Sequence, residues 1–84
     1  MVSYKVELTH SAEKDLFSFD KTTLGRIWLR IKSLALTPFP KGSLKLSGSE
    51  NTYRIRVGRY RVVYTVADET IMVIGIKHRK DAYR

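Results

Sequence analysis

The stretch NTYRIRVGRYRVVYTV, residues 51–66, decides the fold of this chain. Polar and apolar side chains alternate over residues 52–57 and again, less strictly, over 60–66, which is the period of a half-buried strand. Gly58 and Arg59 separate the two runs and fit a type II′ turn, whose first position favours glycine. The stretch therefore predicts a β-hairpin with a two-residue turn.

The register of this hairpin separates an apolar face from a basic one. With a two-residue turn, Arg56 lies opposite Arg61, and we expect these arginines to face outward while the apolar side chains pack on helices. Like charges directly across a strand pair are destabilising, whereas a guanidinium holds phosphate oxygens through two hydrogen bonds. The pattern thus favours a polyanion site, with a solvated polar face as the alternative. The apolar face holds Tyr53, Ile55, Val57, Tyr60, Val62 and Tyr64, and the basic face holds Arg54, Arg56, Arg61 and Val63.

The flanking segments predict two helices and three further strands. The alternation in SYKVEL indicates a first strand, and Thr9 or Ser11 can cap a short first helix. Apolar residues at helical spacing from Asp20 onward predict a second amphipathic helix, whose polar face carries basic residues and which ends before Pro38. We therefore predict an α+β fold of order βααβββ, counting the three long C-terminal strands, with a helix hairpin packed on a twisted antiparallel sheet. The expected strands are 3–8, 44–48, 52–57, 60–66 and 70–78, the expected helices are 10–19 and 20–35, and the basic residues of the second helix are Lys21, Arg26, Arg30 and Lys32.

Size and charge restrict the classes of function. The 84 residues suffice for one domain, residues 1–84, and the net charge of +8 is compatible with nucleic-acid binding. Residues 1–40 contribute +2 and residues 41–84 contribute +6, so the excess follows the strands. Cysteine is absent, which excludes disulfides and thiolate chemistry. No secretion signal or apolar run of membrane-spanning length is visible, so we expect a cytoplasmic protein without a membrane partner.

The last strand determines what lies beside the arginines. If residues 68–69 form a two-residue turn, Ile74, Ile76 and His78 fall on the same side as Arg61, whereas a three-residue loop reverses this. A lone histidine is as often a surface or packing residue as a functional one. No metalloprotease, phosphate-loop or dinucleotide motif is present, and we expect neither a metal nor a cofactor.

Three segments carry a resemblance to a known family. KLSGSENTYRIRVGRYRVVYTVADETIMVIGIKHRKDAYR (residues 45–84), YKVELTHSAEKDL (4–16) and TPFPKGSLKL (37–46) resemble the RelE-type toxins of the RelE/ParE toxin–antitoxin superfamily. The resemblance covers nearly the whole chain. It implies a RelE-like fold and a ribosome-dependent endoribonuclease that cuts mRNA in the ribosomal A site and is held inactive by a cognate antitoxin. Its partners would be that antitoxin and the ribosome with its mRNA and rRNA.

The resemblance also implies roles for individual residues. In the expected reaction a ribose 2′-OH attacks the adjacent phosphate, which requires a base, cations for the phosphorane charge and an acid for the leaving oxygen. Arg61 and Arg79 match the family's cations, and Tyr83 matches its C-terminal tyrosine, which stacks on a base or transfers a proton. The positions expected to bind RNA phosphate are Arg54, Arg56, Arg59, Lys45, Lys77 and Lys80.

The chain departs from the best-known RelE pattern in two places. Arginines replace lysines at the strand positions of Arg54 and Arg56, and His78 precedes Arg79. Because the pKa of arginine lies above about 12, these arginines are poor general bases. His78, with an ordinary pKa of about 6.5, is an alternative base, and the assignment stays open.

Two other functions fit the same sequence. ParE-type toxins share the fold and poison DNA gyrase, and a non-catalytic nucleic-acid-binding module would use the arginines for affinity alone. Tyr83 together with Arg54, Arg56 and Arg61 favours the RelE type. Phe17 and Phe39 are candidate contacts for the antitoxin, although each also fits a place in the core or at its rim.

Overall fold

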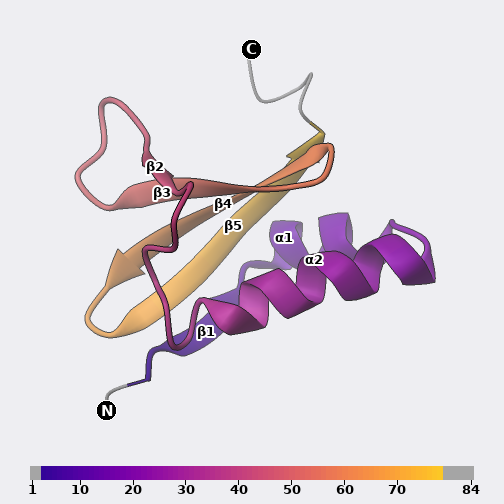
Figure 1. The fold of residues 1–84 in the computed structure, drawn as a ribbon, viewed down its shortest axis with the longest axis horizontal. Helices are drawn as coiled ribbons and strands as arrows, with labels where there is room; N and C mark the ends of the chain where they lie inside the picture. Colours follow the sequence, from indigo (N-terminus) through magenta and orange to yellow (C-terminus); the bar gives the residue numbers. More distant parts are fainter. Residues whose placement is uncertain (1–2, 79–84) are drawn as a thin grey trace.

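The computed structural model describes residues 3–78 and has the predicted α+β architecture. Two helices pack on a five-stranded sheet whose strand order is β1-β5-β4-β3-β2. Figure 1 shows both helices on the same side of the strands. The elements are β1 (Lys5–Leu8), α1 (His10–Phe17), α2 (Lys21–Ser33), β2 (Leu44–Lys45), β3 (Thr52–Val57), β4 (Tyr60–Ala67) and β5 (Thr70–His78).

Helix α1 begins where the sequence places its cap. The backbone N–H of Ala12 donates to Thr9 Oγ1 at 3.1 Å, which satisfies one of the N–H groups that have no partner within the first turn. Ala12 and Leu16 lie one turn apart and are buried, so this face of α1 packs on the sheet. Of the two caps considered, Thr9 is therefore the one used.

Helix α2 supplies the larger part of the helical core. Ile27, Ile31 and Leu34 are fully buried, as the helical spacing predicts. Trp28, predicted on the same face, is 38% exposed and lies at the border of the buried stripe. Basic residues in the last turn, among them Arg30, face the negative end of the helix dipole.

The central hairpin has the predicted register. Arg56 pairs with Arg61, and Gly58 has φ 62°, in the left-handed region that glycine adopts without strain. The second turn is also of the predicted length, and Asp68 and Glu69 have φ values of 51° and 59°. Left-handed φ at both positions is characteristic of a type I′ turn, which matches the twist of the strands it joins.

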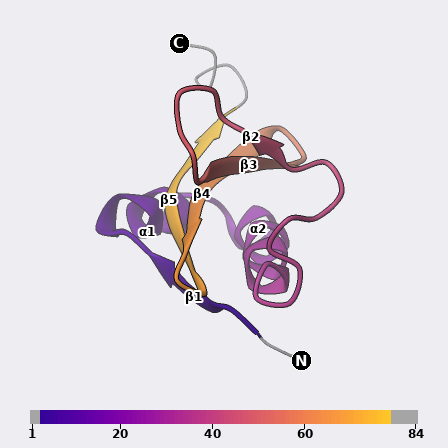
Figure 2. The same ribbon diagram turned by 90° about the vertical axis from the view of Figure 1, so that its left-hand side faces the viewer.

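Strand β1 joins the sheet in an orientation that the sequence analysis did not anticipate. It pairs parallel to β5, with Val6 opposite Ile71, so the sheet is mostly rather than wholly antiparallel. The chain between β1 and β5 contains both helices, and such a length is what a parallel connection requires. Figure 2 shows β1 beside β5 at the lower end of the sheet.

The core lies between the helices and one face of the sheet. Its members are Ala12, Leu16, Ile27, Ile31, Leu34, Ile55, Val57, Val62, Tyr64, Ile71, Val73 and Ile76. Within residues 3–78, none of the helices combines the length and apolarity needed to cross a membrane. The same residues contain no group of three histidine, aspartate or glutamate side chains placed to hold a metal ion.

Tyr64 links the core to the loop that follows α2. Its side chain is fully buried, and its hydroxyl donates to the backbone oxygen of Pro38 at 2.9 Å. Its ring stacks on Tyr53 at a centroid distance of 6.0 Å, and Tyr53 in turn meets Phe39 edge-on at 4.9 Å. One buried phenol thus fixes the loop of residues 37–43 against the sheet.

Burial gives Tyr64 a predictable effect on stability at alkaline pH. Removal from water raises the pKa of its hydroxyl above 10.0, and the Ser43 side chain and the charge of Arg30 oppose this only in part. The phenol stays protonated in the folded chain while it ionises in the unfolded chain, so the native state binds more protons above pH 10. Stability is therefore retained below pH 10 and lost as pH rises toward the folded-state pKa.

The Tyr64→Phe variant lacks the ionisable hydroxyl and serves as the reference. Above pH 10 the free energy of unfolding of the wild type should fall faster with pH than that of Tyr64→Phe, and the two slopes should differ by up to about 1.4 kcal/mol per pH unit. Urea titrations between pH 8 and pH 11 test this, because the other ionisable groups are common to both proteins and cancel in the difference. Parallel pH profiles for the two proteins would contradict the expectation.

Candidate nucleic-acid interface

Three cations form a row across the central strands. Arg56 in β3 lies opposite Arg61 in β4, and Arg61 lies opposite Lys77 in β5. Residues directly opposite in neighbouring antiparallel strands point to the same face, with Cβ atoms roughly 5 Å apart. We call this set the Arg56–Arg61–Lys77 row. It places three like charges side by side, and the carboxylate of Asp15, 3.5 Å from Nζ of Lys77, offsets part of their repulsion.

Arg61 departs from the expectation that the arginines face solvent. It lies on the predicted face, but only 6% of its surface is exposed, whereas Arg56 is exposed. The reason is its place in the sheet: β4 has a strand on each side, so Arg61 stands between two long basic side chains. A charge held at low exposure interacts more strongly with an anion than one in open water.

The prediction that Ile76 and His78 share the face of Arg61 is wrong. The turn at residues 68–69 has two residues as assumed, but Ile74 is an extra residue in β5 and forms a bulge opposite the Val63/Tyr64 step. Because one extra residue reverses the alternation, Ile76 pairs with Val62 in the core. Lys77, rather than His78, therefore stands opposite Arg61.

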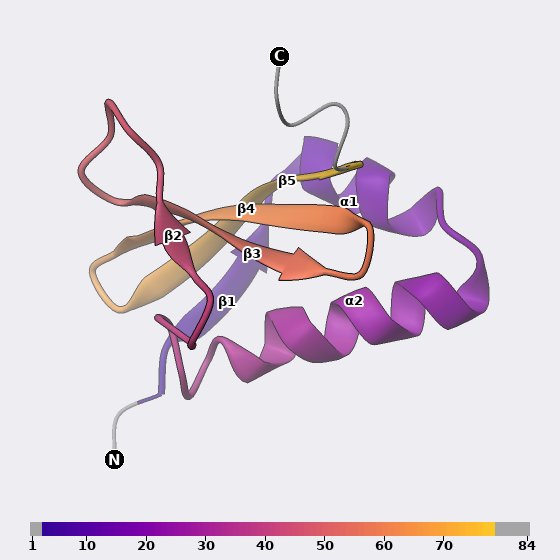
Figure 3. The ribbon, with the colours of Figure 1, turned by 45° about the horizontal axis from the view of Figure 1, so that its top comes forward.

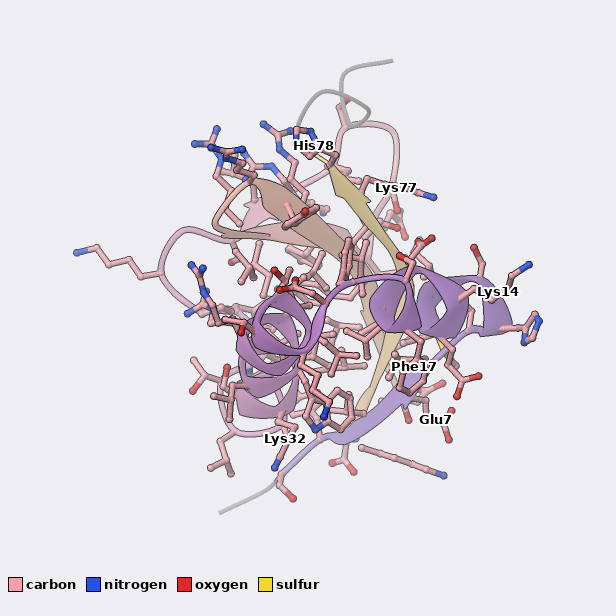
Figure 4. All side chains as sticks on the ribbon, turned by 90° about the vertical axis from the view of Figure 1, so that its right-hand side faces the viewer. Glu7, Lys14, Phe17, Lys32, Lys77 and His78 are labelled. Atoms are coloured by element: carbon pink, nitrogen blue, oxygen red, sulfur yellow. The ribbon has the colours of Figure 1, made fainter. Side chains whose placement is uncertain are left out.

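The bulge places His78 against an aromatic cluster on the other face. His78 pairs with Tyr60, and the two rings meet edge-on at 5.5 Å with an interplanar angle of 88°. The ring of Phe19 also packs on Tyr60, at a centroid distance of 4.6 Å. Figure 4 shows His78 and Lys77 together at the end of β5, where consecutive side chains point to opposite faces of the sheet.

Asp15 of α1 holds the end of β5 in this register. Its Oδ2 accepts a hydrogen bond from the backbone N–H of Ile76 at 3.0 Å and lies 3.5 Å from Nζ of Lys77. Sequence reasoning missed this residue because nothing local connects α1 to β5. A signal for the bulge did exist: Gly75 sits inside an apolar strand pattern, where glycine often marks a bulge or a close approach. A Cβ at Gly75 would lie 3.4 Å from Cε of Lys77.

Asp15→Ala should lower the free energy of unfolding by about 1.5 to 3 kcal/mol, because it removes a charged acceptor from the Ile76 amide. Asp15→Asn keeps an acceptor oxygen and loses only the ion pair with Lys77, so it should cost less. Urea unfolding measures both, and amide hydrogen exchange should accelerate at Ile76 in Asp15→Ala. Undiminished protection of that amide would mean that Asp15 does not hold the strand.

The remaining predicted residues are distributed over three places. Arg54 lies opposite Val63, next to the row on the same face, and Arg59 is exposed in the turn. Lys45 pairs with Tyr53 and thus belongs to the other face, so the structure does not bring it to the row. Arg79, Lys80 and Tyr83 lie outside the described residues.

Comparison with known proteins identifies the family. The family model described as "ParE toxin of type II toxin-antitoxin system, parDE" matches residues 6–83. The chain belongs to this family of type II toxins. Toxin RelG of Mycobacterium tuberculosis is 29% identical over 84 residues, covering 96% of this chain and 97% of its own. RelE1, a proposed toxin of Methanocaldococcus jannaschii, is 32% identical over 88 residues, which cover 99% of this chain and 98% of RelE1.

A solved structure extends the comparison to three dimensions. The RelE of the archaeal RelE–RelB complex from Pyrococcus horikoshii superposes with a TM-score of 0.81 at 31% identity, covering 92% of this toxin and 96% of that chain. This agreement supports the RelE-like fold predicted from the sequence. The family model carries the ParE description and the relatives carry RelE names, so the comparisons establish a RelE/ParE-family toxin.

The toxin also exposes apolar surface on its helix hairpin. Phe17 is 70% exposed and borders a hollow of about 210 Å³ whose wall includes Leu24 and Trp28. Phe39, the other candidate contact, is 50% exposed and packs on Tyr53. Both phenylalanines are thus accessible to a partner, and Phe39 is at the rim of the core.

Proposed function

We propose that this toxin is a metal-independent, ribosome-dependent endoribonuclease that acts in the cytoplasm on mRNA in the ribosomal A site. Attack of the ribose 2′-OH on the adjacent phosphate forms a bond from the 2′-oxygen to phosphorus and breaks the bond to the 5′-oxygen. The products are a 2′,3′-cyclic phosphate and a free 5′-hydroxyl. The 2′-OH proton passes to a base, and the leaving oxygen takes up a proton.

The observation that carries the proposal is the Arg56–Arg61–Lys77 row with Arg61 buried at its centre. A phosphorane carries more negative charge than the phosphate from which it forms. A cation held at low exposure, as Arg61 is, stabilises that additional charge without reorganising. A guanidinium in addition offers two parallel N–H groups to two phosphate oxygens. Such a row therefore favours the transition state over the bound substrate.

We assign roles to the site residues as follows. Arg61 and Arg79 stabilise the charge of the transition state, and Tyr83 stacks on a base or transfers a proton. His78 is the candidate general base or acid, because an imidazole can both accept and donate a proton and His78 stands at the end of β5 beside Lys77. The residues assigned to binding RNA phosphate are Arg54, Arg56, Arg59, Lys45, Lys77 and Lys80, of which Lys45 is on the opposite face from the row.

A cognate antitoxin is the second partner in this proposal. The relative from Pyrococcus horikoshii is a toxin in complex with RelB, and exposed apolar side chains such as Phe17 are suited to burial by a protein. We assign Phe17 and Phe39 to that contact. The toxin would stay inactive until the antitoxin is removed.

A second candidate function is poisoning of DNA gyrase. The observation in its favour is the ParE description of the family model that spans residues 6–83. In that case the basic row would contribute affinity for nucleic acid or for gyrase, and no phosphodiester bond of RNA would be cut.

Primer extension on a defined mRNA tests the proposal. The purified toxin is incubated with the mRNA in the presence and absence of programmed ribosomes, beside a gyrase supercoiling assay. Cuts at codon positions that require ribosomes are the expected result. Inhibited supercoiling without cuts would replace the proposal by the gyrase alternative, and neither activity would leave a binding module.

A further inference from the structure

A groove with basic walls lies between α2 and the open edge of β3. Strand β2 pairs only with Tyr53 and Arg54, so the rest of β3 has a neighbouring strand on one side only. Figure 3 shows α2 running alongside that edge. Two hollows of about 360 and 500 Å³ occupy the space between them, and both are lined by Arg30 and Arg56. We call this the α2–β3 groove; its cations are Arg26, Arg30, Lys41, Arg54 and Arg56.

No acidic side chain is paired with Arg26 or Arg56 of the groove in the part of the chain that the structure describes. Among residues 3–78, no carboxylate lines either hollow. Among the described residues, the ion pairs of Lys5 with Glu7 and of Lys77 with Asp15 lie elsewhere, and Arg26 and Arg56 take part in none. Neighbouring like charges repel, so an anion in the groove would relieve this repulsion as well as gain its own contacts.

Arg30 contributes a buried N–H group to the groove. Among the described residues its Nε has no hydrogen-bond partner, although buried polar atoms in proteins are almost always paired. A buried N–H group that has lost hydration without gaining a partner is destabilising. An anion bound by the outer N–H groups of the guanidinium would offset that cost through its charge. Arg30 lines both hollows, so such an anion would sit at the middle of the groove.

The shape of the groove favours a chain of phosphates over a single small anion. Arg26 and Arg30 are one helical turn apart, about 6 Å along the axis, so they present two successive guanidinium groups along α2. At one end Gly58 lies near Arg26, whose Nη2 is 3.5 Å from the position that a Cβ at Gly58 would occupy. At the other end the groove reaches Lys41. Arg56 belongs both to the groove and to the Arg56–Arg61–Lys77 row, so one strand could pass from one to the other.

We infer that the α2–β3 groove binds backbone phosphates of single-stranded RNA, outside the site of cleavage, with Arg26 and Arg30 as its principal contacts. The choice of RNA over other phosphate chains rests on the proposed function. Binding through phosphate alone reads no sequence, so the groove supplies affinity and orientation to the cleavage site. It also makes affinity dependent on salt, because each phosphate contact releases counterions.

The test measures binding of a fluorescein-labelled 12-nucleotide oligouridylate by anisotropy, without ribosomes, from 50 to 300 mM NaCl. Arg26→Gln/Arg30→Gln should weaken binding about tenfold at 100 mM salt and reduce the slope of log K against log salt by about 1.4, the value for two phosphate contacts on a single strand.

The matched control is Lys14→Gln/Lys32→Gln, which lowers the net charge from +8 to +6 in the same way. Figure 4 shows Lys14 and Lys32 projecting from the helices well away from His78. The control should weaken binding less than about twofold, because its lysines contact no phosphate in this inference.

Equal losses in the two double variants would overturn the inference, since they would report net charge alone. Arg26→Gln alone serves if the double variant unfolds, because Arg26 is exposed, and it should reduce the slope by about 0.7. Polyglutamate is included as a competitor. If it displaces the RNA as well as unlabelled oligouridylate does, the groove takes carboxylates and the inference fails.

The groove and the nuclease proposal can fail separately. If the toxin binds RNA through Arg26 and Arg30 and yet cuts no mRNA on ribosomes, the groove stands and the nuclease proposal falls. If it cuts at codon positions while Arg26→Gln/Arg30→Gln binds RNA like the lysine control, the nuclease proposal stands and the groove is refuted.

Discussion

Arg61→Gln should lower the rate of ribosome-dependent mRNA cleavage by about 100- to 1,000-fold, the range seen when one charge-stabilising donor is removed from a transition state. Arg61 is at the centre of the Arg56–Arg61–Lys77 row and is 6% exposed, so water cannot easily replace its guanidinium. Glutamine is neutral and polar, and its side chain ends two atoms short of the outer guanidinium nitrogens. Single-turnover cleavage on saturating programmed ribosomes measures the rate, and ribosome binding measured beside it should change by less than about tenfold if the charge acts mainly in the transition state.

Arg61→Lys is the matched control for this prediction. It keeps the charge but replaces the planar fork by a single ammonium, so an intermediate rate is expected. Circular dichroism and urea unfolding exclude loss of fold as the cause. A rate for Arg61→Gln within about threefold of wild type would remove Arg61 from the chemistry. A parallel loss of binding and cleavage would instead make it an affinity residue, as in a non-catalytic module.

The hairpin at residues 52–66 was predictable because its determinants are local. Alternation fixes which side chains share a face, and Gly58 permits the left-handed φ that the two-residue turn requires. The same holds for the cap at Thr9 and the buried stripe of α2, which depend on neighbours within one helical turn. Such features need no knowledge of the rest of the chain.

The composition of the candidate site was less predictable because it depends on contacts between distant segments. The bulge at Ile74 moves His78 away from Arg61 and brings Lys77 there, and an Asp15 carboxylate on another element stabilises that arrangement. Arg30 was recognised only as a polar-face residue of α2, since nothing local indicates that β3 lies alongside. Alternation thus predicts a face, while a single extra residue in a strand decides which side chains reach it.

Tyr64→Ala should reduce the free energy of unfolding by about 3 to 5 kcal/mol, the range for truncation of a large buried aromatic side chain. The fully buried ring packs on Tyr53 in the core, and the hydroxyl holds the loop at Pro38, so truncation leaves a cavity and releases the loop. For a domain of this size the loss corresponds to a fall in Tm of roughly 15 to 30 °C. Urea unfolding followed by circular dichroism and by the fluorescence of Trp28, the single tryptophan, measures it.

Tyr64→Phe separates packing from the hydrogen bond, because it keeps the ring and removes only the hydroxyl. Its expected cost is about 0.5 to 1.5 kcal/mol. If both variants lose the same free energy, the bond to Pro38 carries the effect and the ring is replaceable. If Tyr64→Ala stays within about 1 kcal/mol of wild type, the core collapses around the vacancy. A larger loss for Tyr64→Ala than for Tyr64→Phe would mean that the packing of the Tyr64 ring positions the loop that bears Lys41. The same aromatic core supports the arginines of β3. Weakening that core should therefore also weaken RNA binding in the α2–β3 groove.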